Sequence, residues 1–275
     1  MQFFPNAKIN IGLNITEKRS DGYHNLETIF YPIGLKDELF VDKSERITKN
    51  KTDYVLQEFG VEVTNNPERN LVIKALRLLQ EDFDIQQVDI HLRKNIPLGA
   101  GLGGGSSDAA HMLIALNDLF DLKLTVNELE RYAVKIGADC PFFIKNTPVF
   151  ATGIGNIFQP IDLNLSGYYF VLIKSDVHVT TADAYSSIVP KKAEISLIET
   201  IKQPVSAWPD LIFNDFEPVV FKKHPIIYEV KSTLYKMGAE FAIMSGSGSS
   251  VYGLFKELPE SLKMFDKYFV FVDSF

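Results

Sequence analysis

The sequence contains a single cysteine, Cys140, which leaves no partner for an internal disulfide and too few thiolates for a cysteine-rich metal site. One cysteine also suits a reducing compartment. No activating residue stands beside it, so we expect it to pack as a small hydrophobic residue rather than act as a nucleophile. The five histidines have no spacing typical of metal ligands. We therefore name no protein ligand for a metal.

Positive charge is also scarce, with 28 Lys and Arg against 35 Asp and Glu and a formal net charge of −7. This balance argues against a broad surface for nucleic acid, so any anionic ligand must be bound locally. No apolar run approaches the roughly 18 residues of a membrane span. A strand-like pattern begins almost at once, so residues 1–8 do not resemble a signal peptide. We expect a cytoplasmic protein that binds a small molecule, without nucleic acid or membrane, as a monomer or homodimer.

The chain of 275 residues is long enough for about two domains. Alternating or apolar runs predict strands over 7–15, 23–41, 88–93, 168–176 and 267–272, and two strands around a Gly/Ser turn over 239–255. Helices are expected after Asn70, from Ser106 or Ser107, from the Thr125–Glu128 capping box to Gly137, and over 226–237. We place a domain boundary near residue 155, giving domains 1–155 and 156–275.

The densest signal is PLGAGLGGGSSDAA over residues 97–110, with five glycines in seven positions before a predicted helix. A dinucleotide-binding loop fits poorly, because Lys94, Asn95, Ile96 and Pro97 intervene between the preceding strand and the glycines, and no acidic residue ends a following strand. A Walker A loop fails because Gly105 stands where its lysine would be. What remains is an anion cradle of backbone amides and a helix N-terminus, with a tight glycine-rich connection as the alternative. Ser106 and Ser107 would add hydroxyls for a phosphate, or one could contact a phosphate-bound Mg²⁺.

Other candidate residues each have a plainer explanation. Lys8 and Asn10 share one face of the first strand, which is also the usual pattern of a solvated face. Asp139 precedes a proline and two phenylalanines, where it could be a base or only a turn residue. His24 could offer a hydrogen bond or belong to a surface turn. The SGSGSS run at 245–250 could supply amides to a phosphate or form a flexible hairpin turn.

Taken together, the strand AKINIGLNI, the loop PLGAGLGGGSSDAA and the late turn MSGSGSSVYGLF resemble the motifs of the GHMP kinase superfamily. The segments DGYHNLETIF, GADCPFF, VHVTTADAY and NDFE resemble the branch that phosphorylates the 2-hydroxyl of 4-diphosphocytidyl-2-C-methyl-D-erythritol with ATP and Mg²⁺ in non-mevalonate isoprenoid synthesis. The resemblance extends from residue 5 to about residue 255.

The resemblance implies two α+β domains, an N-terminal ATP-binding domain like ribosomal protein S5 domain 2 and a ferredoxin-like substrate-binding domain. It implies Asp139 as general base, Lys8 keeping that base ionised, and Asn10 positioning the substrate. Tyr23 and Tyr185 would stack on the cytosine while His24 reads its polar edge, and Asp139 would also touch the substrate. The implied ATP-binding residues are Asn70, Pro97, Leu98, Gly99, Ala100, Gly101, Leu102, Gly103, Gly104, Gly105, Ser106 and Ser107.

Three competing functions remain at this point. One is a dehydrogenase, which failure to bind any dinucleotide would exclude. Another is a different kinase of the superfamily, acting on homoserine or mevalonate. The DGYH segment and Tyr185 argue against it. A nucleotide-binding protein without catalysis would not need both Lys8 and Asp139.

Overall fold

The computed structural model describes residues 1–45, 53–60 and 66–275, and two compact units divide the chain. The first unit comprises residues 1–7, 32–98 and 103–147, and the second comprises 8–31, 99–102 and 148–275. The chain passes between the units several times, including within the glycine-rich segment. The boundary expected near residue 155 stays a prediction.

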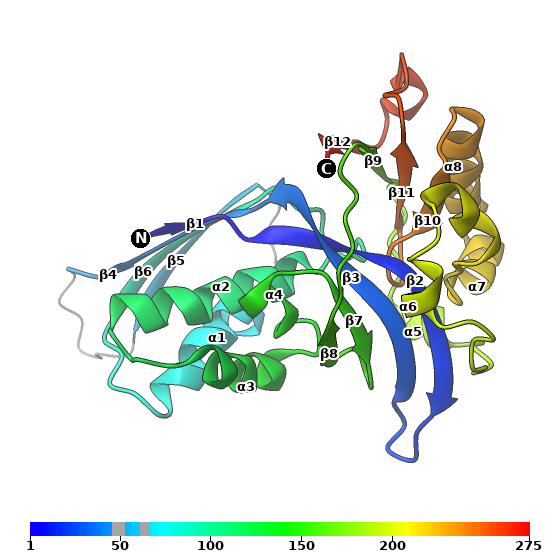
Figure 1. Ribbon diagram of the computed structural model, residues 1–275. Helices are drawn as coiled ribbons and strands as arrows, with labels where there is room; N and C mark the ends of the chain where they lie inside the picture. Colours follow the sequence, from blue (N-terminus) through cyan, green and yellow to red (C-terminus); the bar gives the residue numbers. More distant parts are fainter. Residues whose placement is uncertain (46–52, 61–65) are drawn as a thin grey trace. The chain divides into compact units, whose positions relative to one another are not determined.

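The first unit contains a four-stranded sheet in the order β1-β4-β6-β5 (Figure 1). Its strands are β1 (Gln2–Phe3), β4 (Glu38–Lys43), β5 (Tyr54–Gly60) and β6 (Val88–Lys94), and only the β5–β6 pairing is parallel. Val88, Ile90 and Leu92 alternate along β6 and are fully buried, as their spacing predicts. They pack on helices along one face of the sheet.

The helices of the first unit are α1 (Leu71–Gln80), α2 (Gly104–Leu119), α3 (Val126–Ile136) and α4 (Phe142–Lys145), after a short 3₁₀ turn at Pro67–Arg69. Asn70 caps α1 and Thr125 and Glu128 form the capping box of α3, as predicted, and Gly137 ends α3. The predicted start of α2 is wrong: Gly103 is its N-cap, so both serines lie inside the first turns. Glycine suits this N-cap position because the backbone of Gly103 is left-handed, a conformation that glycine adopts without steric cost.

The second unit contains an antiparallel sheet in the order β10-β11-β9-β12. Its strands are β9 (Tyr169–Lys174), β10 (Phe241–Met244), β11 (Ser250–Phe255) and β12 (Phe269–Ser274), which confirms the four strands predicted there. The helices are α5 (Thr181–Tyr185), α6 (Leu197–Thr200), α7 (Glu217–Lys223) and α8 (Pro225–Lys236), with 3₁₀ turns at Val205–Asp210 and Lys263–Phe265. Helix α8 packs on β10 and β11 (Figure 1).

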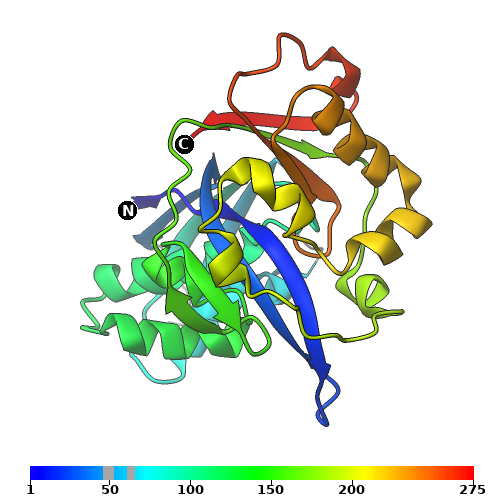
Figure 2. The ribbon, with the colours of Figure 1, turned by 45° about the vertical axis from the view of Figure 1, so that its right-hand side comes forward.

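A third sheet has the order β2-β3-β7-β8. Strands β2 (Asn6–Lys18) and β3 (His24–Lys36) form a long hairpin, drawn in blue in Figure 2, and β7 (Val149–Thr152) and β8 (Ile157–Pro160) follow β3. Ala7, Ile9, Ile11 and Ile15 are fully buried, and β2 confirms the strand predicted over residues 7–15. The α+β class is therefore confirmed. Within the described ranges, no helix combines the length and apolar character needed to cross a bilayer.

Candidate functional site

Lys8 and Asn10 are buried on β2, with only 3% and 2% of their surfaces exposed, so the solvated-face alternative is wrong. The Lys8 ammonium donates to Asn10 Oδ1 at 2.6 Å and to the Gly101 carbonyl at 3.4 Å. It also lies 4.6 Å from the centre of the Phe30 ring, a favourable cation–π distance. A buried ammonium needs this density of acceptors, because desolvation would otherwise favour its neutral form.

The NH₂ group of the Asn10 side-chain amide is also hydrogen-bonded. Its Nδ2 donates to Thr28 Oγ1 at 2.9 Å, and the Thr28 hydroxyl donates to the Gly12 carbonyl at 2.5 Å. The backbone carbonyl of Asn10 accepts from the Tyr252 hydroxyl at 3.0 Å. The strand therefore presents Lys8 and Asn10 with fixed side chains.

Residues 99–102 of the glycine-rich segment lie against these groups in the second unit. The Lys8 amide donates to the Leu102 carbonyl at 2.9 Å. Ser245 bridges the strand and the loop: its Oγ accepts from the Asn10 amide at 3.1 Å and donates to the Gly101 carbonyl at 2.9 Å. The loop is thus held by β2 on one side and by the Gly/Ser turn on the other.

The SGSGSS run forms the turn between β10 and β11, and Ser245, Ser249 and Ser250 are all buried in it. The Ser250 amide donates to the Ala100 carbonyl at 3.3 Å, and the Asn214 amide nitrogen donates to the Met244 and Gly246 carbonyls at 2.8 Å. The turn is therefore packed in place, unlike the flexible turn considered from the sequence. That it also supplies amides to a phosphate stays a prediction.

The rest of the glycine-rich segment belongs to the first unit. In the described part of the chain, no side chain caps the first turn of α2, so its amides donate no hydrogen bond to a capping side chain. Ser106 is half-buried and Ser107 is buried in this turn. Uncapped amides at the positive end of a 16-residue helix form an arrangement that favours an anion.

The first unit also contains a buried ion cluster of Lys94, Asp37 and Asp108, which the sequence prediction missed. It connects Lys94, ahead of the glycine-rich segment, with Asp108 near the end of that segment. The Lys94 ammonium donates to Asp37 and, at 2.6 Å, to Asp108 Oδ2. Asp37 Oδ1 accepts from the amides of Asn95 and Ile96 at 2.6 and 2.8 Å. Burial raises the pKa of Asp108 to about 7, with Lys94 opposing that rise and Asp37 adding to it. A signal was present, because Lys94 continues the buried alternation of β6 and a buried lysine requires a carboxylate partner.

Asp139 and Cys140 lie in the turn between α3 and α4. Asp139 is half-buried, and its carbonyl accepts from the Phe142 amide at 3.3 Å, which is the turn geometry considered from the sequence. Its role as a base stays a proposal. Cys140 is fully buried, and burial raises the pKa of its thiol to about 12. The thiol therefore stays protonated at neutral pH, which confirms that it is a packing residue.

The aromatic residues predicted to bind the substrate lie in the second unit. Tyr23 is at the hairpin tip and is 62% exposed. His24 and Tyr185 stack on each other, with ring centres 4.9 Å apart and planes inclined by 24°. Phe216 meets Tyr185 edge-on at 4.8 Å. The structure thus brings His24 to Tyr185 and leaves the ring of Tyr23 largely exposed.

Asn70, predicted to lie near adenine, acts in the first unit as a helix cap. Its Oδ1 accepts from the Val72 amide at 3.0 Å and its Nδ2 donates to Glu58 at 2.8 Å. Contact with a nucleotide base stays a prediction.

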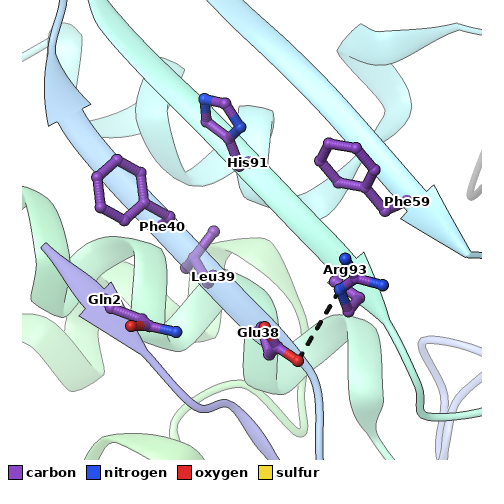
Figure 3. Close-up of a pocket in the computed structure, with 7 residues that line it drawn as sticks. All are labelled: Gln2, Glu38, Leu39, Phe40, Phe59, His91 and Arg93. Carbon is purple, nitrogen blue, oxygen red and sulfur yellow. Dashed lines mark ion pairs between the residues drawn. The ribbon is translucent and has the colours of Figure 1, made fainter.

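A separate hollow of about 160 Å³ lies on the face of the first sheet that is opposite to its helices (Figure 3). The ring of His91 stands between Phe40 and Phe59, edge-on to Phe40 at 5.7 Å and stacked with Phe59 at 6.4 Å. The Arg93 guanidinium lies 3.9 Å from Glu38. No residue predicted for the phosphate or substrate site lines this hollow, so it is not the predicted site.

Comparison with known proteins identifies two family models along the chain. One, described as the GHMP kinases N terminal domain, matches residues 70–147, and the other, GHMP kinases C terminal, matches residues 197–268. A 4-diphosphocytidyl-2-C-methyl-D-erythritol kinase of Bacteroides fragilis is 56% identical over 261 residues, covering 95% of this chain and 94% of that protein. The enzyme of the same name from Parabacteroides distasonis is 55% identical over 254 residues, covering 92% and 91%.

Solved structures agree with these relatives. A 4-(cytidine 5'-diphospho)-2C-methyl-D-erythritol kinase superposes with a TM-score of 0.81 and 29% identity, covering 99% of this chain and 98% of that one. A homoserine kinase from Cytophaga hutchinsonii superposes with a TM-score of 0.62 at 19% identity, covering 98% and 95%, which shows a shared fold alone.

Proposed function

Because the chain belongs to the GHMP kinase family, we propose that it transfers the γ-phosphoryl group of ATP to the 2-hydroxyl of 4-diphosphocytidyl-2-C-methyl-D-erythritol. The products are ADP and the 2-phosphate, and the reaction serves non-mevalonate isoprenoid synthesis. The observation that carries the proposal is the 55–56% identity, over nearly the whole length, to relatives that bear this enzyme's name.

The buried Lys8 and Asn10 support the catalytic part of the proposal. In it, Asp139 accepts the proton of the attacking hydroxyl, while Lys8 keeps the carboxylate ionised and orients that hydroxyl with Asn10. Phosphoryl transfer depends mainly on positioning and charge stabilisation, so a rigid ammonium is more useful than a mobile one. The contacts that Lys8 makes with Asn10 and Gly101 supply that rigidity.

The ATP phosphates are assigned to the backbone of residues 97–105 and the hydroxyls of Ser106 and Ser107, with Asn70 near the adenine. The uncapped first turn of α2 supports this assignment, because its amides and helix dipole favour negative charge. Within the described residues, no three His, Cys, Asp or Glu side chains gather as a metal site. Mg²⁺ is therefore assigned to the phosphates of ATP itself, where it would neutralise developing charge, and no step here depends on a protein-bound metal.

The cytosine of the substrate is assigned to Tyr23, His24 and Tyr185. The observed stacking of His24 on Tyr185 supports an aromatic surface at this position. A cytosine ring stacks on tyrosine and offers an amine and a carbonyl at its edge, which a histidine can read by hydrogen bonds. In this assignment, the exposed ring of Tyr23 stacks on the cytosine.

The test is ADP release by the purified chain with ATP and Mg²⁺, measured in parallel with 4-diphosphocytidyl-2-C-methyl-D-erythritol, homoserine and mevalonate. Release with the cytidyl substrate and none with the other two supports the proposal. Release with homoserine or mevalonate would reassign the acceptor. ATP binding without turnover on any of the three would instead support a nucleotide-binding protein without this activity.

A further inference from the structure

Three buried polar side chains form a row across β2 and β3 that ends on a backbone carbonyl. Lys8 donates to Asn10 Oδ1 at 2.6 Å, Asn10 Nδ2 donates to Thr28 Oγ1 at 2.9 Å, and the Thr28 hydroxyl donates to the Gly12 carbonyl at 2.5 Å. Thr28 is completely buried. Neither the motifs nor the family resemblance gave it a role.

The direction of these hydrogen bonds follows from what each group can offer. A hydroxyl has one hydrogen to donate, and Thr28 gives it to Gly12. Toward Asn10, the hydroxyl therefore acts as an acceptor, and an acceptor selects the NH₂ end of the amide. The carbonyl end of Asn10 is then turned to Lys8.

The opposite orientation of the amide is disfavoured at both ends. A rotated Asn10 would place its NH₂ group against the Lys8 ammonium, where both groups are donors, and its carbonyl against a threonine oxygen whose proton is already committed. The Asn10 backbone is also held, because its amide donates to Ser245 and its carbonyl accepts from Tyr252. Rotation of the side-chain amide is the freedom that remains, and Thr28 controls it.

We propose that Thr28 is a positioning residue that fixes the amide orientation of Asn10 and thereby directs the Lys8 ammonium. The inference depends on the proposed function, in which Lys8 and Asn10 act at the reacting hydroxyl. Thr28 itself touches neither nucleotide nor substrate in this scheme.

The test replaces Thr28 with valine, which keeps the branched shape suited to a strand and removes the hydroxyl. We expect kcat for ADP release to fall about 10- to 100-fold, as small misplacements of positioned groups do, with the KM values for ATP and the cytidyl substrate nearly unchanged. Thr28→Ser retains the hydroxyl and should restore most of kcat. Thr200→Val is the matched control, since Thr200 of α6 is also buried and its hydroxyl donates at 3.1 Å to the carbonyl of Ser196, the residue before that helix.

The orientation is read independently of turnover by NMR of the Asn10 side-chain amide. Its NH₂ protons should exchange slowly with solvent in the wild type and in Thr28→Ser, and faster in Thr28→Val. If Thr28→Val does not fold, the pair Thr28→Ser and Thr28→Ala makes the same comparison with one hydroxyl as the difference.

Unchanged kcat in Thr28→Val, an equal loss in Thr200→Val, or no restoration by Thr28→Ser would overturn the inference. A wild type that is inactive on all three acceptors would refute the proposed function instead. In that case the amide exchange still decides whether Thr28 orients Asn10: equal exchange in Thr28→Val and Thr28→Ser would overturn the inference.

Discussion

Replacing Gly101 with alanine tests whether the glycine-rich segment is constrained by the protein itself. The backbone of Gly101 has a φ of +75°, a left-handed conformation that costs an alanine about 1–2 kcal/mol. An alanine Cβ at this position would lie 2.0 Å from the Ser245 carbonyl oxygen and 3.3 Å from that of Gly248. Both obstacles are backbone atoms, so a side-chain rotation cannot relieve the contact.

Relief therefore requires the loop or the Gly/Ser turn to move by more than an ångström. That movement would break the hydrogen bond from Ser245 Oγ to the Gly101 carbonyl, now 2.9 Å long, and would weaken the contact of Lys8 with the same carbonyl. Overpacking of this kind costs roughly 1–3 kcal/mol beyond the backbone strain. We expect the free energy of unfolding to fall by about 2–5 kcal/mol in total.

Gly105→Ala is the matched control, because it adds the same methyl group four residues away. Its Cβ would meet nothing closer than Leu71 Cδ1 at 3.6 Å, and Gly105 lies in the regular backbone of α2. Alanine is favoured over glycine in a helix by roughly 0.5–1 kcal/mol, so this variant should be as stable as the wild type or slightly more so.

Urea unfolding of the three proteins measures both effects. An unchanged midpoint in Gly101→Ala, or equal destabilisation by the two substitutions, would refute the argument that the Ser245 carbonyl forbids a side chain at Gly101.

Three further predictions concern other residues of the site. Asp139→Asn should lower turnover about 10²- to 10⁴-fold while ATP binding measured by calorimetry stays near normal, and unchanged turnover would remove Asp139 from the mechanism. Burial raises the pKa of Asp108 from 3.8 to about 7. Between these pH values the folded protein keeps the Asp108 proton and the unfolded chain loses it, so the free energy of unfolding falls as pH rises from about 4 to 7. Asp108→Asn should flatten the pH dependence of urea unfolding across this window, and an identical slope would contradict the assignment. Tyr185→Ala should raise KM for the cytidyl substrate about 10-fold or more by loss of stacking, with KM for ATP unchanged, and an equal rise in both constants would argue for a structural role.

Local patterns predicted part of the regular structure, where side-chain periodicity or a capping interaction is visible among neighbouring residues. The alternation from Ala7 to Ile15 gave β2, and the Thr125–Glu128 capping box gave the start of α3. The start of α2 was misplaced because a serine is a better N-cap than a glycine by propensity, whereas the left-handed backbone at position 103 selects glycine. The required φ depends on the path of the preceding loop, which the local sequence does not determine.

Contacts between distant parts of the chain set the remainder of the site. Lys8 was consistent with either a solvated or a buried face, and the choice is made by Phe30 and Gly101, which are 22 and 93 positions away in the sequence. The cluster of Lys94, Asp37 and Asp108 was missed for a similar reason. A lysine in phase with buried residues indicates that a carboxylate must exist, but its position follows only from the packing of α2 on the sheet.

Contacts with distant residues also change how the glycine-rich segment is interpreted. From the sequence, five glycines suggested a ligand lying against bare backbone. In the structure, Gly101 is required by the Ser245 carbonyl, and a Cβ on Gly104 would come within 2.8 Å of the Ile96 side chain. Those two positions are explained by the protein's own packing, so they do not by themselves argue for a phosphate. Gly105, whose added methyl would meet no such obstacle, is the glycine whose presence the folded chain does not require. If a phosphate binds at the first turn of α2, Gly105→Ala should therefore weaken ATP binding without loss of stability. Unchanged ATP binding in this variant would show that the phosphate does not bind at that turn.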